Sequence, residues 1–269
     1  RGAILVRERA ADLDAPVGAF LKLTGGAQPN AFLLESIEGG AARGRYSGIG
    51  MAPDLVWRCK GGKAEINRHA LSAPHAFEPE AGPALDSLRR VIAAARMPVP
   101  PGLPPMAAGL FGYLGYDMVR LIEKLPETNP DVLGIPDAVL TRPTLMAVFD
   151  HVRDTWTLCA PIWPGGEPDA AIEAALARLD EAEAALDRPV PRPAPPAVLP
   201  KLGEPSSNFT EASFTAAVEK AKEYIRAGDA FQIVPSQRFS VPFALPPFSL
   251  YRALRRINPA PFLVFGDFG

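Results

Sequence analysis

The sequence has 269 residues, of which 48% are hydrophobic and 22% are charged, and its formal net charge is -2 at pH 7. This composition is typical of globular proteins and excludes a fibrous or disordered chain. The charge is close to zero and no block of lysine and arginine occurs, so we expect no nucleic acid and no membrane surface as a partner. A chain of this length is expected to form one or two domains, with a small molecule as its partner.

The two cysteines, Cys59 and Cys159, occur in unrelated contexts without CxxC spacing. This pattern supports neither a disulfide framework nor a zinc site, and it is typical of a reducing compartment. Residues 1–7 contain too few apolar positions for a signal peptide or a membrane span. We therefore expect a cytoplasmic protein.

The first part of the chain predicts short strands in an antiparallel meander, with a helix on either side. A strand is expected at residues 4–6, followed by a helix that begins near Ala15 with Asp14 as its N-cap. The apolar run at residues 31–37 predicts a mostly buried strand that ends at the glycine pair 39–40. Further elements are strands at residues 46–49, 55–59 and 64–67 and a helix at residues 83–95.

The second part begins with a predicted hairpin of long strands and continues into helices. The hairpin is expected at residues 138–149 and 155–160, and an alanine-rich helix follows Pro168. Thr210 is predicted to cap a later helix, which Gly228 ends. The remaining elements are strands at residues 231–235 and 238–241 and a helix at residues 249–257.

Strands outnumber helices and do not alternate regularly with them, which favours an α+β fold with mixed or antiparallel sheets and flanking helices. The proline-rich residues 188–205 show no hydrophobic period and predict an extended linker. The predicted organisation is therefore an N-terminal regulatory domain at 1–187, a linker at 188–207, and the beginning of a second domain at 208–269.

Glu35 and Ser36 place a carboxylate and a hydroxyl inside an apolar strand. Such groups cost free energy when buried unless each finds a partner. An amino-acid ligand could supply one through its ammonium group, while Leu33 and Leu34 would help to enclose an apolar ring. The alternative is that Ser36 begins a turn and Glu35 faces solvent, and the pattern alone favours this alternative.

Pro259 and Pro261 restrict the backbone around Ala260 near the end of the sequence. The two prolines favour a stiff, extended segment, so that Phe262 and Leu263 would form a rigid apolar surface. The alternative is an ordinary loop that leads into a core strand at residues 262–265.

The pattern contains no complete catalytic or metal site. Glycines at 109, 112 and 115 lack the GxGxxG order of a nucleotide site and more readily permit close strand packing or bulges. The histidines have no carboxylate or cysteine at metal-ligand spacing, and no GxSxG occurs. The histidines, expected on the surface, are His69, His75 and His151.

Two segments at opposite ends of the chain, residues 33–50 and 258–263, resemble the large component of anthranilate synthase. In that family these segments form the feedback site for L-tryptophan. Phe262, Leu263 and Ala260 stand where the commonest form of the motif has tyrosine, methionine and serine. Residues 228–238 also resemble the start of the chorismate-binding domain. The resemblance implies that the residues contacting L-tryptophan are Glu35, Ser36, Pro261, Phe262 and Leu263.

The resemblance also implies an activity, that of a lyase of tryptophan biosynthesis. Ammonia from a glutamine amidotransferase subunit is added to chorismate, and pyruvate is eliminated to give anthranilate. Mg²⁺ is the implied cofactor, because the chorismate dianion and its departing hydroxyl need charge neutralisation. The family's metal-binding glutamates and catalytic histidine would follow Gly269, so the chain is expected to be regulatory, structural and catalytically incomplete.

Two alternatives remain open. One is aminodeoxychorismate synthase component I, which has the same scaffold and which the sequence of residues 258–262 favours. Residues 33–36 and 44–50 favour anthranilate synthase more strongly. The other alternative is a non-enzymatic module that binds an amino acid or docks a partner.

Overall fold

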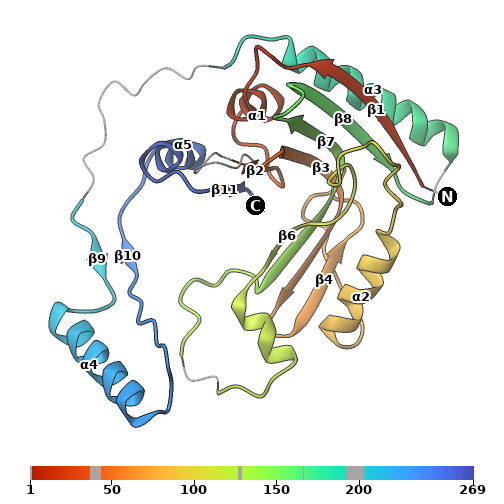
Figure 1. Cartoon of the computed structure of the whole chain (residues 1–269). Coiled ribbons are helices and arrows are strands. Elements are labelled where there is room, and N and C mark those ends of the chain that lie inside the picture. Colours follow the sequence, from red (N-terminus) through yellow and green to blue (C-terminus); the bar gives the residue numbers. More distant parts are fainter. Residues whose placement is uncertain (1, 37–43, 127–128, 166, 192–202) are drawn as a thin grey trace. The chain divides into compact units, whose positions relative to one another are not determined.

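The structure is a computed structural model that describes residues 2–36, 44–126, 129–165, 167–191 and 203–269. The chain forms two compact units, one of residues 1–192 with 246–269 and one of residues 193–245 (Figure 1). The C-terminal 24 residues thus belong to the same compact unit as the first 192. The domain boundaries expected at 187 and 208 remain a prediction.

The first unit is built on an antiparallel sheet, to which nine strands of the described residues belong (Figure 1). Its main path runs β1-β8-β7-β3-β2-β11. In addition, β4 pairs with β3, β6 pairs with β7, and β5 pairs with β4. The strands are β1 (Ala3–Ala10), β2 (Phe32–Ser36), β3 (Tyr46–Lys60), β4 (Lys63–Asn67), β5 (Glu78–Pro79), β6 (Phe111–Leu114), β7 (Ala138–Asp150), β8 (Thr155–Ile162) and β11 (Phe262–Gly266).

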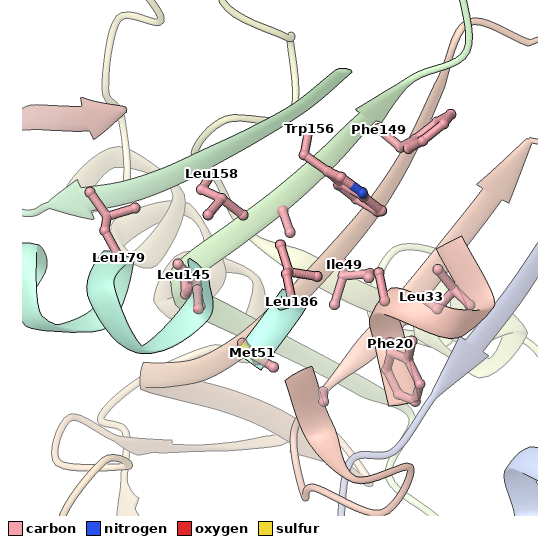
Figure 2. Close-up of a cluster of buried hydrophobic side chains, with 14 of the residues drawn as sticks. Phe20, Leu33, Ile49, Met51, Leu145, Phe149, Trp156, Leu158, Leu179 and Leu186 are labelled. Carbon is pink, nitrogen blue, oxygen red and sulfur yellow. The ribbon is translucent and has the colours of Figure 1, made fainter. Parts of the chain in front are cut away.

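Helices flank this sheet and supply part of its core. They are α1 (Pro16–Thr24), α2 (Ala84–Ala94), the 3₁₀ helix η1 (Tyr116–Leu121), α3 (Pro168–Leu186) and α5 (Pro247–Ile257). Helices α1, α3 and α5 contribute to the largest hydrophobic cluster, whereas α2 packs in a second cluster with β3 and β4. Figure 2 shows the first cluster, in which Leu179 of α3 lies near Leu158 and Leu145 of the sheet and Phe20 of α1 lies near Ile49 and Leu33.

The sheet is buried on both faces along its central strands. In β7, Leu145 and Phe149 belong to the first cluster, while Met146 and Val148 belong to a third cluster on the other face. Successive side chains of a strand point to opposite faces, so a strand that is covered twice is apolar at nearly every position. This double burial explains the continuous apolar runs in the sequence.

The second unit contains β9 (Ser206–Ser207), α4 (Glu211–Ala227) and β10 (Phe239–Ser240). Thr210 caps α4 in a capping box with Ser213, and Gly228 ends the helix with a φ of 84°, both as predicted. The strand expected at residues 231–235 is wrong, because this segment is not a strand and Phe231 is 95% exposed. Apolar residues form a strand only where another strand can pair with their backbone groups.

The α+β fold with flanking helices is confirmed, and two local predictions are corrected. Residues 46–49 and 55–59 belong to one strand, β3, whose pairing with β7 shifts register between Pro53 and Leu55. Asp14 is not the N-cap of α1; Ala15 holds that position, and Asp14 accepts a hydrogen bond of 2.8 Å from Lys22. The glycine pair 39–40 and most of the proline-rich segment lie outside the described residues.

Candidate functional site

Strands β2 and β11 bring together the two segments that the sequence singles out. They pair in antiparallel register, with Phe262 opposite Ser36 and Leu263 opposite Glu35. Pro261 directly precedes β11 at the start of this pairing. β11 is the last strand on its side of the main path, next to β2 in Figure 1. Four of the five expected site residues are therefore cross-strand partners, and the fifth adjoins them.

The strand alternation divides these residues between the two faces of the sheet. Leu33 belongs to the first hydrophobic cluster and Leu263 packs against it, so Glu35 shares their face. Leu34 packs against the third cluster on the other face. Ser36 and Phe262 share that second face, because opposed residues of an antiparallel pair point the same way.

The Glu35 carboxylate is engaged within the protein. Glu35 is 3% exposed. The Tyr251 hydroxyl donates a 2.5 Å hydrogen bond to Oε2, and Arg255 Nε donates to Oε2 at 2.9 Å and to Oε1 at 3.1 Å. Burial and the bond to Glu35 raise the pKa of Tyr251 above its ordinary value, so this hydroxyl remains a proton donor. Both partners come from α5, four residues apart and thus on one helix face.

Ser36 differs from Glu35 in having an unused side-chain oxygen. Its backbone N–H donates to Ser47 Oγ at 3.0 Å, and the same oxygen lies 2.8 Å from His151 Nε2. Ser36 Oγ itself is buried and has no hydrogen-bond partner among the described residues. A buried hydroxyl without a partner is destabilising, and a polar atom of a ligand would satisfy it.

The surroundings of Ser36 combine this hydroxyl with apolar surface. Phe262 is 74% exposed and Val264, two residues further on the same face, is 66% exposed. Gly44 passes so close that a Cβ there would lie 1.6 Å from Ser36 Oγ, so any larger residue at this position would displace the Ser36 side chain. A hydroxyl that lacks a partner beside an exposed aromatic ring suits a small molecule with both a polar and an aromatic part.

Tyr251 and Arg255 were not predicted as partners of Glu35, although its carboxylate was expected to need one. The available signal was the periodicity of α5, where Phe248, Tyr251 and Arg255 recur at helical spacing. His151 was expected on the surface but is half-buried beside Ser47, with its ring edge-on to Phe149 at 4.7 Å.

Among the described residues, no group of three or more His, Cys, Asp or Glu side chains is arranged to hold a metal ion. No described helix has the length and apolar character needed to span a bilayer.

Residues 32–269 match the family described as chorismate binding enzyme. The chain is 52% identical to anthranilate synthase component 1 of Cereibacter sphaeroides, covering 99% of this chain and 53% of that protein. It is 39% identical to anthranilate synthase component 1 of Thermus thermophilus, covering 96% of this chain and 52% of that protein. The crystal structure of anthranilate synthase component I from Streptococcus pneumoniae TIGR4 superposes with a TM-score of 0.66 at 26% identity, over 97% of this chain and 55% of that one. The chain thus spans about half the length of the relatives it matches. It belongs to the chorismate-binding enzyme family and is a homologue of anthranilate synthase component 1.

Proposed function

We propose that the chain is the N-terminal part of an anthranilate synthase component I and carries most of its L-tryptophan feedback site. The longer protein would be a cytoplasmic, allosteric lyase that converts chorismate and ammonia into anthranilate and pyruvate. A glutamine amidotransferase subunit would supply the ammonia, and Mg²⁺ would assist the reaction. No group of three or more possible metal ligands occurs among the described residues; we assign to them no step of the reaction and expect them to be inactive by themselves.

The observation that carries the proposal is the pairing of Ser36 with Phe262. This pairing places a buried hydroxyl that lacks a described partner next to an exposed aromatic ring. L-Tryptophan presents an aromatic indole beside an ammonium and a carboxylate, so its ring can lie against Phe262 while its polar end reaches Ser36. Aromatic pairs stabilise a complex by about 0.5–1.5 kcal/mol beyond the burial of their surface.

Pro261 contributes to this site through the backbone. Its ring fixes φ in the residue that leads into β11, so Phe262 enters the sheet from a restricted segment. Phe262 is therefore held in place before a ligand arrives, which lowers the entropic cost of binding. Leu263 points to the other face and packs in the core, so its contribution is to hold β11 in register.

The proposed site is tested by titrating L-tryptophan into the 269-residue chain in a calorimeter. Ser36→Arg would place a long cation on the face shared with Phe262, and we expect it to weaken binding at least a hundredfold. Ser72→Arg is the matched control, because Ser72 is an exposed serine outside the site. The proposal is wrong if the wild-type chain does not bind L-tryptophan, or if Ser36→Arg binds it as well as Ser72→Arg does.

Catalysis is tested separately with chorismate, ammonium and Mg²⁺ while anthranilate fluorescence is followed. We expect no product from these 269 residues alone. Release of anthranilate would refute the assignment of catalysis to other parts of the protein. An amination product that retains the pyruvyl group would identify the aminodeoxychorismate synthase alternative.

A further inference from the structure

The carboxylate of Glu35 and the hydroxyl of Ser36 serve different partners. Glu35 lies on the face of β2 that packs against α5, and both oxygens of its carboxylate accept hydrogen bonds from that helix. Ser36 and Phe262 lie on the opposite face. A ligand held against Ser36 and Phe262 is thus separated from the Glu35 carboxylate by the sheet itself.

The contact between Glu35 and α5 has the character of a buried ionic cluster. The Glu35 side chain is 2% exposed and the Arg255 side chain is 35% exposed, so the anion is shielded from water while the cation reaches the surface. Removing one partner from such a pair leaves a buried charge without compensation. The position of β2 is therefore energetically tied to the position of α5.

The same helix also holds the second strand of the candidate site. Phe265 of β11 packs against Phe248 with ring centroids 5.0 Å apart and against Tyr251 at 5.8 Å. In addition, α5 ends at Ile257 and runs through four residues into β11. Helix α5 thus contacts β2 through Glu35 and β11 through Phe265, so it fixes the two strands relative to each other.

We propose that Glu35 acts as a coupling residue between the effector site and helix α5, with Tyr251 and Arg255 as positioning residues, and does not bind the ammonium group of the effector. This inference rests on the proposed function, since it concerns the regulation of the same site. The effector would bind across β2 and β11 on the Ser36 face, and it would favour the arrangement of the two strands that the Glu35 cluster maintains.

Loss of the Glu35 cluster is expected to lower the apparent affinity for the effector. A ligand shifts an equilibrium only by its differential affinity for the two arrangements. Loss of the cluster allows arrangements of β2 and β11 that do not fit the ligand, so the apparent affinity falls by the fraction of molecules in those arrangements. The ligand contacts themselves are unchanged, so the selectivity for the ammonium group is expected to remain.

The test compares two ligands in the 269-residue chain, L-tryptophan and indole-3-propionate, which has the same skeleton without the amino group. The variants are Glu35→Gln, Tyr251→Phe and Arg255→Gln. We expect each variant to weaken L-tryptophan binding about tenfold, within the usual range of coupling between sites. The ratio of the two affinities should stay at the wild-type value. The double variant Glu35→Gln/Arg255→Gln should lose less than the sum of its single changes, because the residues act as one unit.

Arg256→Gln is the matched control. Arg256 is the neighbour of Arg255 on α5, is exposed, and forms no ion pair with a described residue. Arg255→Lys should restore part of the affinity because it keeps the positive charge near Glu35. Circular dichroism and thermal unfolding identify any variant that fails to fold, and Tyr251→Phe removes only one hydroxyl if the charge changes prove too severe.

Two results would overturn the inference while leaving the proposed function intact. One is a fall in the affinity ratio in Glu35→Gln with unchanged binding in Tyr251→Phe and Arg255→Gln, which would show that Glu35 contacts the ammonium group. The other is wild-type affinity in all three variants. A wild-type chain that binds no L-tryptophan would refute the proposed function, and the inference with it.

Discussion

Glu35 and Ser36 are neighbours in the chain, yet their side chains lie on opposite faces of the sheet. Glu35 accepts hydrogen bonds from Tyr251 and Arg255, whereas Ser36 lies opposite Phe262. A polar pair in an apolar strand suggests one shared ligand, but the alternation of a strand separates the two groups. Glu35 therefore lies on the face of the sheet that packs against α5, and Ser36 lies on the face that carries the exposed Phe262 ring.

Gly112→Ala is expected to destabilise the protein by about 3 kcal/mol, because overpacking and an unfavourable backbone angle act together. Gly112 has a φ of 154°, and a Cβ there would lie 1.9 Å from the carbonyl oxygen of Val139. Gly61 is the control, because its φ is 54° and a Cβ at that position would meet no atom within 4 Å. Gly61→Ala should cost only about 1 kcal/mol. Urea unfolding of both variants measures the difference, and equal losses would contradict close strand packing at Gly112.

Phe248→Ala is expected to lower the free energy of unfolding by about 3–5 kcal/mol, as for other buried phenylalanines. Phe248 is 2% exposed, and its ring lies 4.6 Å from that of Phe20 and 5.0 Å from that of Phe265. Phe262→Ala should change stability by only about 0.5 kcal/mol, because this ring is 74% exposed. Thermal unfolding distinguishes the two variants. A large loss of stability in Phe262→Ala would show that this ring supports the fold and is not reserved for a ligand.

Glu80 is expected to make stability depend on pH. Its carboxylate accepts hydrogen bonds from Arg68 at 2.7 Å, Ser87 at 2.9 Å and Arg90 at 3.2 Å. The bond from Arg68, followed by those from Ser87 and Arg90, lowers the pKa of Glu80 below 4.5 against the opposing effect of burial. A lowered folded-state pKa means that the contribution is complete above the unfolded value and is lost as the pH falls through the folded value.

Glu80→Gln should therefore destabilise the protein at pH 7 by about 1–2 kcal/mol. The difference from wild type should begin to shrink as the pH falls through the unfolded-state value near 4.5, where the unfolded chain takes up the proton, and it should vanish below the lower folded-state pKa of Glu80. Urea unfolding at several pH values measures this trend, with Glu123→Gln at an exposed position as the control. A difference that stays constant down to pH 3 would show that the charge of Glu80 is not what stabilises the fold.

Both cysteines are expected to resist alkylation in the folded protein. Cys59 and Cys159 are buried, and burial raises the pKa of Cys159 to about 12. The pKa of Cys59 is also raised, first by burial and then by Asp137. At pH 8 both side chains remain thiols, and the thiolate is the reactive form. Iodoacetamide should modify neither cysteine until urea unfolds the protein, after which mass spectrometry should find two adducts. Rapid modification of the native protein would contradict this burial.

Several features of this chain depend only on residues that are close together in the sequence. The N-cap at Thr210 and the helix end at Gly228 follow from local hydrogen bonding and backbone freedom, and the structure shows both. The hairpin of β7 and β8 follows from two apolar runs separated by a short polar turn. The antiparallel α+β class follows from the order of these elements.

The packing of distant segments sets which face of the sheet each side chain of β2 lies on and which partner it contacts. Tyr251 lies 216 positions from Glu35 in the chain, so no local pattern indicates their hydrogen bond. Residues 231–235 are apolar enough for a strand but have no strand to pair with in the described part of their unit. Strand pairing and the burial of charged groups depend on contacts between distant segments, and these contacts exist only once the chain has folded.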